Sequence, residues 1–313
     1  MDVLTDILNT LRFQGSLYFR TELTSPWSIF VPPKPEVARF HIVIRGQGWL
    51  RVEGQGDDLS ITNGDLVVVP HGAAHTILDD PATPARPLDE ILAEVKYTGV
   101  GPLIYGGSGP GSCLVCGEFG FAGAGLHPLL ANLPPLLHIP GSESYNKTWL
   151  DSALGFIAHE AVAGKAGSLA IVNRLSEIIF IQVIRAFADA SQAQIPFLAA
   201  LSDPQISQAL SHIHDEPAST LTVETLGRLV GMSRSTFSNR FSALVGMTPH
   251  HYLTFIRLQR AAHFLATTDD PLATIAERVG YQSETAFSTA FKRHFGIRPG
   301  EYRQTHQTPA DLT

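Results

Sequence analysis

The stretch GMSRSTFSNRFSALVGMTPHHY, residues 231–252, decides the fold of the C-terminal third of this chain because it occurs there twice. Residues 280–302, GYQSETAFSTAFKRHFGIRPGEY, repeat its pattern with one inserted residue. Both copies contain a leading glycine, two phenylalanines four residues apart, a second glycine, a proline and a tyrosine, in that order. An internal repeat about fifty residues apart predicts two copies of one helical unit.

Each copy has the sequence features of a helix-turn-helix. Gly231 and Gly280 suit the left-handed conformation that ends a helix. Ser233 and Ser283 are N-cap candidates for the helix that follows. The paired phenylalanines bury one face of that helix and leave the opposite face outward, where a helix-turn-helix contacts the DNA major groove. Residues 252–266 predict a linker helix between the two units.

This arrangement resembles the DNA-binding domain of AraC/XylS-type regulators over about residues 207–303. The resemblance rests on GMSRSTFSNRF, FIRLQRAAHFL, IAERVGYQSETAFSTAFKRHFG and RPGEY. It implies that the bases are read by positions on both second helices, namely Arg234, Ser235, Ser238, Asn239, Glu284, Thr285, Ser288 and Thr289. It also implies phosphate contacts by Arg240, Lys292 and Arg293. The chemistry is suitable, because Asn pairs with adenine, Arg with guanine, and Glu accepts from cytosine.

Charge alone does not indicate DNA binding. The net charge is −7, but from Ser202 onward ten Lys/Arg face ten Asp/Glu, so the preceding part carries twelve against nineteen. A neutral DNA-binding region holds phosphates only modestly. We therefore expect side-chain geometry and dimerisation to supply much of the affinity.

The front part of the chain has a β pattern. Residues 40–44, 49–52 and 66–69 are short β-rich runs separated by turn residues, which predict a β-sandwich or barrel over residues 15–125. Residues 1–12 predict a short amphipathic helix. His127 precedes Pro128 at a predicted helix start and is not expected to bind a metal.

Helical patterns follow from about Lys147. One apolar stripe comprises Trp149, Leu150, Leu154, Ile157 and Ala161. The segment Leu169–Ala188 predicts a long helix that charged and amide residues interrupt, which favours a helix buried between domains or subunits over a membrane span.

The β-rich part resembles a cupin barrel. HIVIRG, residues 41–46, and LVVVPHGAAH, residues 66–75, correspond to the two paired cupin motifs. The resemblance implies metal-ligand positions at His41 and His75, but Val43 stands where the family has a second histidine, and the expected glutamate is missing. Two ligands are too few for the usual cupin oxygenase site.

The two cysteines are candidates to complete this set. CLVCG, residues 113–117, has the spacing of a metal-binding knuckle. Cys113 and Cys116 together with the two histidines would make a tetrahedral zinc site of a structural or sensory kind. Two other interpretations stay open: a dithiol that senses oxidants without metal, and small buried residues beside buried histidines.

Taken together, HIVIRG, LVVVPHGAAH, CLVCG and HPLLANLP resemble the cupin-bearing AraC-type regulators. That group includes a reactive-chlorine-responsive activator with a similar Cys-Xaa-Xaa-Cys. An additional N-terminal cysteine of that regulator has no counterpart in Tyr18–Glu22 here.

We therefore predict an α+β protein with a cupin-like β-barrel sensor over residues 1–140, a helical connector or dimerisation region over 141–200, and a DNA-binding domain with two helix-turn-helix units over 201–313. The predicted function is transcription regulation by a non-enzyme that senses a metal, redox or small-molecule signal, with Zn²⁺ as the candidate cofactor. The predicted partners are promoter or operator DNA, RNA polymerase and a second copy of the chain, and no membrane. We expect a bacterial cytoplasmic protein that joins the nucleoid when bound to DNA, because two cysteines build no disulfide framework and no long apolar run is present.

Two alternatives remain at this point. One is a cupin enzyme, a metal-dependent isomerase or dioxygenase, with an appended DNA-binding domain. The other is an architectural DNA-binding protein whose affinity for DNA is indifferent to any signal.

Overall fold

The computed structural model describes residues 3–11, 13–99, 101–121, 127–141, 152–153, 155–157, 160, 165–190 and 195–306. The chain packs as two units. The sheet unit comprises Phe13–Phe121 and Leu133–Ala190, and the helical unit comprises Met1–Arg12, Ala122–Asn132 and Ser191–Thr313. The three-part division predicted from the sequence did not foresee that the chain contributes to the helical unit in three separate segments.

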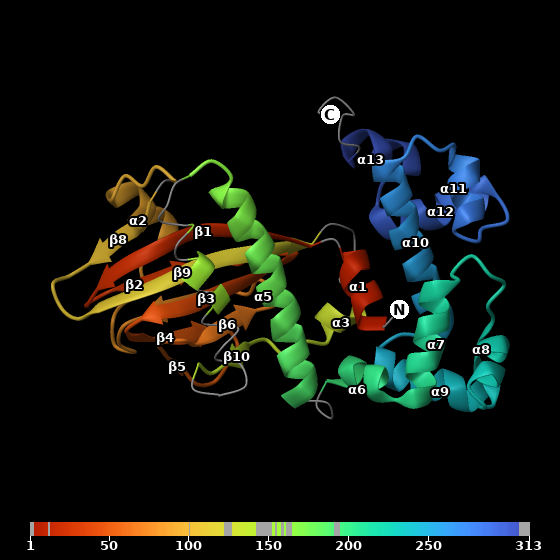
Figure 1. The fold of residues 1–313 in the computed structure, drawn as a ribbon, viewed down its shortest axis with the longest axis horizontal. Coiled ribbons are helices and arrows are strands. Elements are labelled where there is room, and N and C mark those ends of the chain that lie inside the picture. Colours follow the sequence, from red (N-terminus) through yellow and green to blue (C-terminus); the bar gives the residue numbers. More distant parts are fainter. Residues whose placement is uncertain are drawn as a thin grey trace. The chain divides into compact units, whose positions relative to one another are not determined.

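The sheet unit contains two β-sheets (Figure 1). The first has the strand order β10-β6-β3-β9-β1-β8, with bounds Leu137–Ile139, Leu66–Val69, Val37–Arg45, Gly111–Phe121, Phe13–Thr24 and Leu103–Gly106. The second has the order β2-β7-β4-β5, with bounds Ser28–Val31, His75–Leu78, Gln47–Val52 and Leu59–Thr62. The predicted runs 40–44, 49–52 and 66–69 lie within β3, β4 and β6, and the strands described pair into two sheets rather than one closed barrel.

The space between the two sheets is the core of this unit. Alternate residues of each strand point into it, because successive side chains of a strand face opposite sides. Val43, Val67 and Leu114 come from the first sheet, and Ile29 and Ile77 from the second. A short helix, α2 (Leu88–Glu94), also packs its side chains against this core and was not predicted.

The helix α5 (Ser168–Ala190) covers the outer face of the first sheet, as the green helix in Figure 1 shows. The rings of Phe180 and Phe119 lie 4.8 Å apart. A Cβ at Gly15 of β1 would come within 2.7 Å of the Ser176 Cβ, so only glycine allows this approach. The prediction of a long helix over 169–188 is confirmed.

Two further expectations concern helices. None of the helices that the structure describes combines the length and apolarity needed to cross a membrane. The apolar stripe predicted between Trp149 and Ala161 falls mostly outside the described residues, where only Ile157 of that stripe is described, fully buried.

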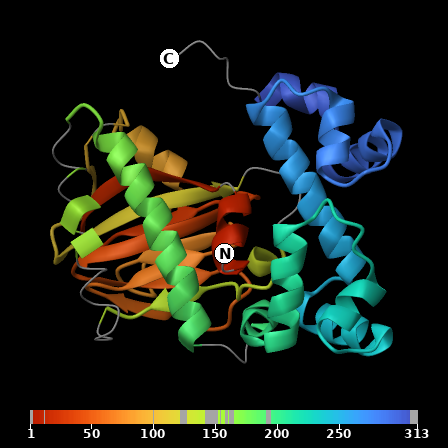
Figure 2. The same ribbon diagram turned by 45° about the vertical axis from the view of Figure 1, so that its right-hand side comes forward.

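The helical unit contains both helix-turn-helix motifs (Figure 2). The first consists of α8 (Val223–Leu229) and α9 (Arg234–Val245), and the second of α11 (Leu272–Arg278) and α12 (Glu284–Phe295). The linker helix is α10 (Pro249–Thr267), longer than predicted, and α13 (Pro299–His306) follows the second motif. The remaining helices of the unit are α1 (Val3–Leu11), α3 (Pro128–Ala131), α6 (Pro196–Ser202) and α7 (Pro204–Asp215).

The local signals predicted for the two motifs are confirmed. Gly231 and Gly280 have φ angles of 70° and 83°, in the left-handed region. The Ser233 and Ser283 side chains each accept a hydrogen bond from a backbone N–H three residues on, at 3.2 Å. The phenylalanine pairs of α9 and α12 are fully buried. These contacts orient the opposite, exposed face of each second helix.

Candidate DNA-reading surface and sensor cavity

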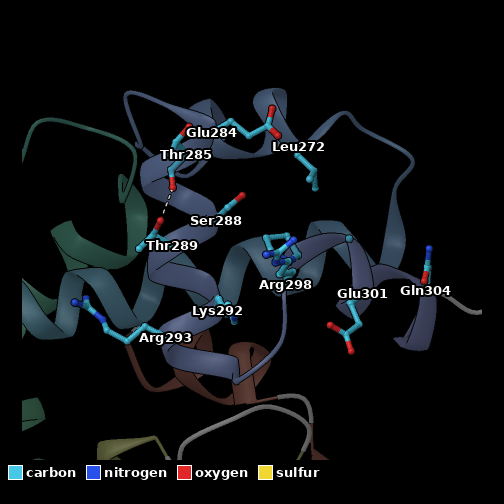
Figure 3. A pocket seen from close by; sticks show the side chains of 12 residues that line it. Leu272, Glu284, Thr285, Ser288, Thr289, Lys292, Arg293, Arg298, Glu301 and Gln304 are labelled. Atoms are coloured by element: carbon cyan, nitrogen blue, oxygen red, sulfur yellow. Dashed lines mark hydrogen bonds between the residues drawn. The ribbon is translucent and has the colours of Figure 1, made fainter.

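The second reading helix, α12, forms one wall of an open hollow of about 850 Å³ (Figure 3). All six residues predicted on this helix line it, namely Glu284, Thr285, Ser288, Thr289, Lys292 and Arg293. The structure therefore brings the predicted set together on one surface.

Six further residues of the hollow were missed by sequence reasoning. Leu272 lies at the start of α11, and the other five lie at or after the start of α13: Arg298, Pro299, Gly300, Glu301 and Gln304. A helix N-terminus presents free backbone N–H groups to phosphate oxygens, and Arg298 adds a cation beside them. The signal was present in the RPG sequence, since proline favours the first position of a helix.

The side chains of this hollow offer different contacts to DNA. The Thr289 hydroxyl donates to the Thr285 carbonyl oxygen at 2.9 Å, shown dashed in Figure 3. Its hydrogen is therefore used within the helix, which leaves the methyl group for apolar contact with thymine. Lys292 and Arg293 are exposed cations. The lining of the hollow thus contains residue types suited to phosphate binding and residue types suited to base discrimination.

The first reading helix, α9, presents its predicted residues differently. Arg234, Ser235 and Asn239 are exposed and Ser238 is half-buried. Arg240 donates from its guanidinium to the Asp203 carboxylate, which also caps α7. The phosphate contact predicted for Arg240 competes with this ion pair, and it stays a prediction, as do the base contacts of both helices.

A second candidate site is a cavity of about 310 Å³ within the sheet unit. That volume lies at the lower end of the roughly 300–1,000 Å³ typical of small-molecule sites. Its walls are mostly apolar side chains: Phe19, Leu23, Trp27, Ile29, Val31, Ile77, Leu88, Leu92 and Leu114. Its polar lining consists of Thr21, Lys34, Arg39, His41 and Cys116. Such a cavity suits a small molecule with an apolar body.

The two predicted histidines meet beside this cavity. The Nε2 atoms of His41 and His75 lie 2.8 Å apart, and His75 Nδ1 lies 2.9 Å from the Ala73 carbonyl oxygen. Burial lowers the pKa of His75 to about 4 and that of His41 well below its usual value, so both rings are neutral near pH 7.

The hydrogen positions on these rings follow from their partners. His75 must donate from Nδ1 to the carbonyl, so its Nε2 accepts from the Nε2–H of His41. His41 Nδ1 then carries no hydrogen and can only accept a hydrogen bond, and it has no hydrogen-bond partner among the described residues. A ligand that carries a donor can complete this group.

Arg39 places a buried positive charge at the same cavity. The residue is 6% exposed, and burial lowers its pKa. One guanidinium nitrogen donates to the Pro32 carbonyl oxygen at 2.5 Å, whereas Nε has no partner in the described part of the chain. Its cross-strand neighbour Glu118 accepts instead from Lys34 Nζ at 2.7 Å. Trp27 Nε1 is a second unpartnered donor of the cavity lining.

The two cysteines do not share a site with each other. Cys116 belongs to the core between the sheets, whereas Cys113 lies on the other side of β9 and accepts from Arg20 Nε at 3.2 Å. Residues three apart on a strand face opposite sides, with Cα atoms roughly 10 Å apart. The spacing Cys-Xaa-Xaa-Cys indicates a knuckle only where the backbone turns, and here it lies within a strand.

The predicted zinc set therefore does not fit this arrangement. In the part of the chain that the structure describes, no group of three or more His, Cys, Asp or Glu side chains is placed to hold a metal ion. A direct Cys113–Cys116 disulfide would need a Cα separation below about 7 Å. Burial also raises the pKa of both thiols, whereas reactive cysteines have lowered values. Zinc binding and dithiol sensing stay predictions.

Comparisons with known proteins identify the families of the two parts of the chain in which these sites lie. Residues 2–189 match the cupin family, and residues 226–305 match the helix-turn-helix domain family. An AraC-like transcription regulator of Streptomyces antibioticus is 33% identical over 310 residues, which cover 99% of this chain and 100% of the relative. The RCS-specific HTH-type transcriptional activator RclR of Escherichia coli is 27% identical over 308 residues, 97% of this chain and 98% of the relative.

Solved structures are similar over the C-terminal third. The DNA-binding domain of AdpA, in complex with a target DNA, shares 32% identity and covers 33% of this chain and 92% of its own, with a TM-score of 0.31.

A cupin domain joined to two helix-turn-helix motifs defines a DNA-binding transcription regulator with a sensor domain. The chain belongs to the AraC-like transcription regulators that carry an N-terminal cupin domain. The predicted family, fold class and regulatory function are confirmed, with double-stranded DNA as the partner of the helix-turn-helix domain.

Proposed function

We propose that a small amphipathic acid controls the DNA binding of this regulator by occupying the cavity between the two sheets. The observation that carries this proposal is the Arg39 side chain, a buried cation without a carboxylate partner among the described residues, in an otherwise apolar cavity. An uncompensated buried charge is costly, and an acid would remove that cost on binding.

The remaining unpartnered polar groups of the cavity further restrict the chemical class of the ligand. Trp27 Nε1 and Arg39 Nε are donors that suit a carboxylate, whereas His41 Nδ1 is an acceptor that needs a hydroxyl or N–H group. An aromatic or short aliphatic acid with one hydroxyl group matches all three. The small volume excludes long chains.

The test uses the full-length protein and an operator obtained by binding-site selection. Operator affinity and melting temperature are measured with salicylate and 2-hydroxyoctanoate, and with the amide of each as a neutral control. We expect each acid, but neither amide, to raise the melting temperature and to change operator affinity at least 10-fold. A response to the amides equal to that of the acids would contradict the charge argument.

Two variants of α2 locate the response. Leu92 lines the cavity, and Leu92→Trp should fill it and abolish the acid response. Val95 follows the same helix and is 36% exposed, so Val95→Trp is the matched control. Arg39→Gln should leave an apolar cavity that no longer prefers the acid. Retained response in Leu92→Trp would place the ligand elsewhere.

The alternative signals are tested in the same assay. Zinc and an oxidant are added in place of the acid, and zinc content is measured by elemental analysis. Because Cys113 lies on the far side of β9, any bound zinc should persist in Cys113→Ser. Loss of zinc in that variant would show that the four predicted ligands gather in solution. Consumption of either acid over hours would favour the enzyme alternative.

We also propose that the working form is a homodimer that recruits RNA polymerase. Ile171 and Ile178 are 46% and 49% exposed and lie seven residues apart on α5. That spacing is typical of a helix–helix seam, and a second copy of α5 is the partner that supplies the same pattern. Ile171→Glu with Ile178→Glu should yield monomers in sedimentation, whereas an unchanged mass would place the interface elsewhere.

A further inference from the structure

Two segments that flank strands of the sheet unit in sequence belong to the helical unit instead. The first is α1, whose Ile7 is fully buried and which lies beside α7, as the labels in Figure 1 show. The second is the segment His127–Asn132, whose helix α3 packs against α6. In sequence, α1 ends two residues before β1 begins, and β9 ends at Phe121, six residues before His127.

A buried chain of hydrogen bonds joins both segments to the helical unit. His214 of α7 lies with Nδ1 2.6 Å from an Asp6 carboxylate oxygen of α1. Its Nε2 lies 2.8 Å from the hydroxyl of Tyr252, at the start of α10. That hydroxyl lies 3.4 Å from His127 Nε2, and His127 Nδ1 accepts from the Leu129 backbone N–H at 3.1 Å. His127, His214 and Tyr252 are each at most 2% exposed.

The hydrogen positions at the two ends of this chain follow from their partners. His127 accepts at Nδ1, and burial lowers its pKa well below the usual value, so its neutral ring carries the hydrogen on Nε2. His127 therefore donates to the Tyr252 hydroxyl, and His214 donates from Nδ1 to the Asp6 carboxylate. The His214 bond lowers the pKa of Asp6, which keeps this carboxylate charged.

The chain also reaches the first reading helix. The Tyr252 ring packs against Phe241 of α9, with centroids 5.8 Å apart. The Asn132 side chain lies against Gly246, the residue that ends α9, and a Cβ placed there would be 3.2 Å from Asn132 Nδ2. The hydrogen-bonded chain thus contacts the core side of α9 through the Tyr252 ring, and the His127–Asn132 segment contacts the C-terminal end of α9 through Asn132.

We propose that the chain Asp6–His214–Tyr252–His127 is a latch that holds α1 and the His127–Asn132 segment on the helical unit and thereby sets the position of α9. The latch makes the first reading helix, rather than the second, the place where the sheet unit controls DNA binding. Strands β1 and β9, which lead directly into the two latched segments, both line the cavity. Control of the latch by a ligand rests on the proposed function, whereas the latch itself does not.

The experiment compares two latch variants with two matched controls in the full-length protein. Tyr252→Phe removes the shared hydroxyl without changing ring size, and Asp6→Ala, at a partly exposed position, removes the terminal acceptor. The controls are Tyr302→Phe, the equivalent tyrosine of the second unit, and Asp215→Ala, an exposed carboxylate on α7. The measurement is hydrogen exchange of backbone amides, without ligand.

We expect exchange in residues 3–11 and 127–132 to accelerate at least 10-fold in both latch variants and to stay unchanged in both controls. In footprinting on the selected operator, we call the segment read by α9 the α9 half-site and the segment read by α12 the α12 half-site. The protein concentration needed to protect the α9 half-site should rise at least 10-fold in both latch variants. The concentration needed to protect the α12 half-site should stay unchanged. Asp6→Ala keeps the test valid if Tyr252→Phe unfolds.

Two results would overturn the proposal. Unchanged exchange of α1 in both latch variants would show that the hydrogen bonds do not hold it. Accelerated exchange with both half-sites bound as in the wild type would show that the docked segments do not position α9. Neither result depends on whether the cavity binds an acid, so the latch and the proposed ligand fail separately.

Discussion

The two helix-turn-helix units share one sequence pattern but differ in their surroundings. Gly246 and Gly296 end the two reading helices with φ angles of 82° and 78°. A Cβ at Gly246 would contact Asn132, whereas a Cβ at Gly296 would meet nothing within 4 Å among the described residues. Tyr252 joins two buried histidines, whereas the Tyr302 ring stacks on His306 at 3.9 Å.

This difference suggests that the two units have different tasks, one in responding to the sensor and the other in holding DNA. The first unit is fastened to segments that are continuous with the sensor strands, so its reading helix can report the state of the sensor. The second unit presents an open hollow lined by three cations, Lys292, Arg293 and Arg298, and by the carboxylates Glu284 and Glu301. If the proposed latch operates, the first unit attaches to DNA adjustably and the second attaches independently of the sensor.

The largest effect is expected when the predicted base contacts are removed from one reading helix at a time, which tests whether α9 and α12 contribute differently to operator binding. Arg234→Ala with Asn239→Ala should weaken operator binding by about 100-fold or more, because each good base contact contributes about 1–3 kcal/mol. Glu284→Ala with Thr289→Ala should chiefly relax sequence preference at the other half-site. Footprints and melting curves of both doubles check this, and an unchanged footprint in the first double would refute the assignment of α9.

Lowering the pH should weaken the docking of α1 and the His127–Asn132 segment on the first unit more than it affects the second unit. The folded-state pKa of His127 lies well below its ordinary value of 6.5, so its contribution to docking is complete above pH 6.5 and is lost as pH falls below that value. Each extra proton bound by the undocked state costs about 1.4 kcal/mol per pH unit. Exchange of residues 3–11, corrected for its intrinsic pH dependence, should accelerate roughly fivefold between pH 6.5 and 5.5.

The same measurement on α12 serves as the internal reference, since His294 there is less deeply buried than His127. His127→Gln should remove the acid dependence from residues 3–11. Equal acid sensitivity of α1 and α12 would count against a special role for the first unit.

The smallest difference between the two units is expected in how strongly operator affinity depends on salt concentration. Lys292→Ala should reduce the slope of log affinity against log salt by about 1, because one phosphate contact is lost. Arg240→Ala should reduce it less, since that guanidinium already pairs with Asp203. Equal losses of slope for the two variants would show that DNA displaces the Arg240 ion pair.

The repeat was predictable because its signals are local. A glycine followed two or three residues later by a serine defines where α9 and α12 begin, at Arg234 and Glu284, and the buried phenylalanines define which face is outward. The partners of α1 were not predictable, since its apolar stripe shows that it docks but not that its contact lies 208 residues away. Long-range pairing leaves no mark in local sequence.

The cavity illustrates the same limit. The alternation in β3 could have marked Arg39 as an inward cation beside His41, and that signal was missed. The cysteine spacing alone did not determine the local backbone, because Cys-Xaa-Xaa-Cys occurs both in a metal-binding knuckle and within a strand. The resemblance to cupins predicted the sheets, but not which of their polar groups would lack a partner.

The three-segment composition of the helical unit has a consequence for how the protein is made. The ribosome releases α1 before the sheet unit, and Asp6 meets His214 only after 208 further residues have emerged. The apolar side chain of Ile7 therefore stays exposed in the nascent chain until the sheet unit and α7 have been synthesised. Contacts between residues so distant in sequence form slowly. A fragment that begins at Ser191 would fold without two of its own segments, leaving the hydroxyl of Tyr252 with only one of its two histidine partners.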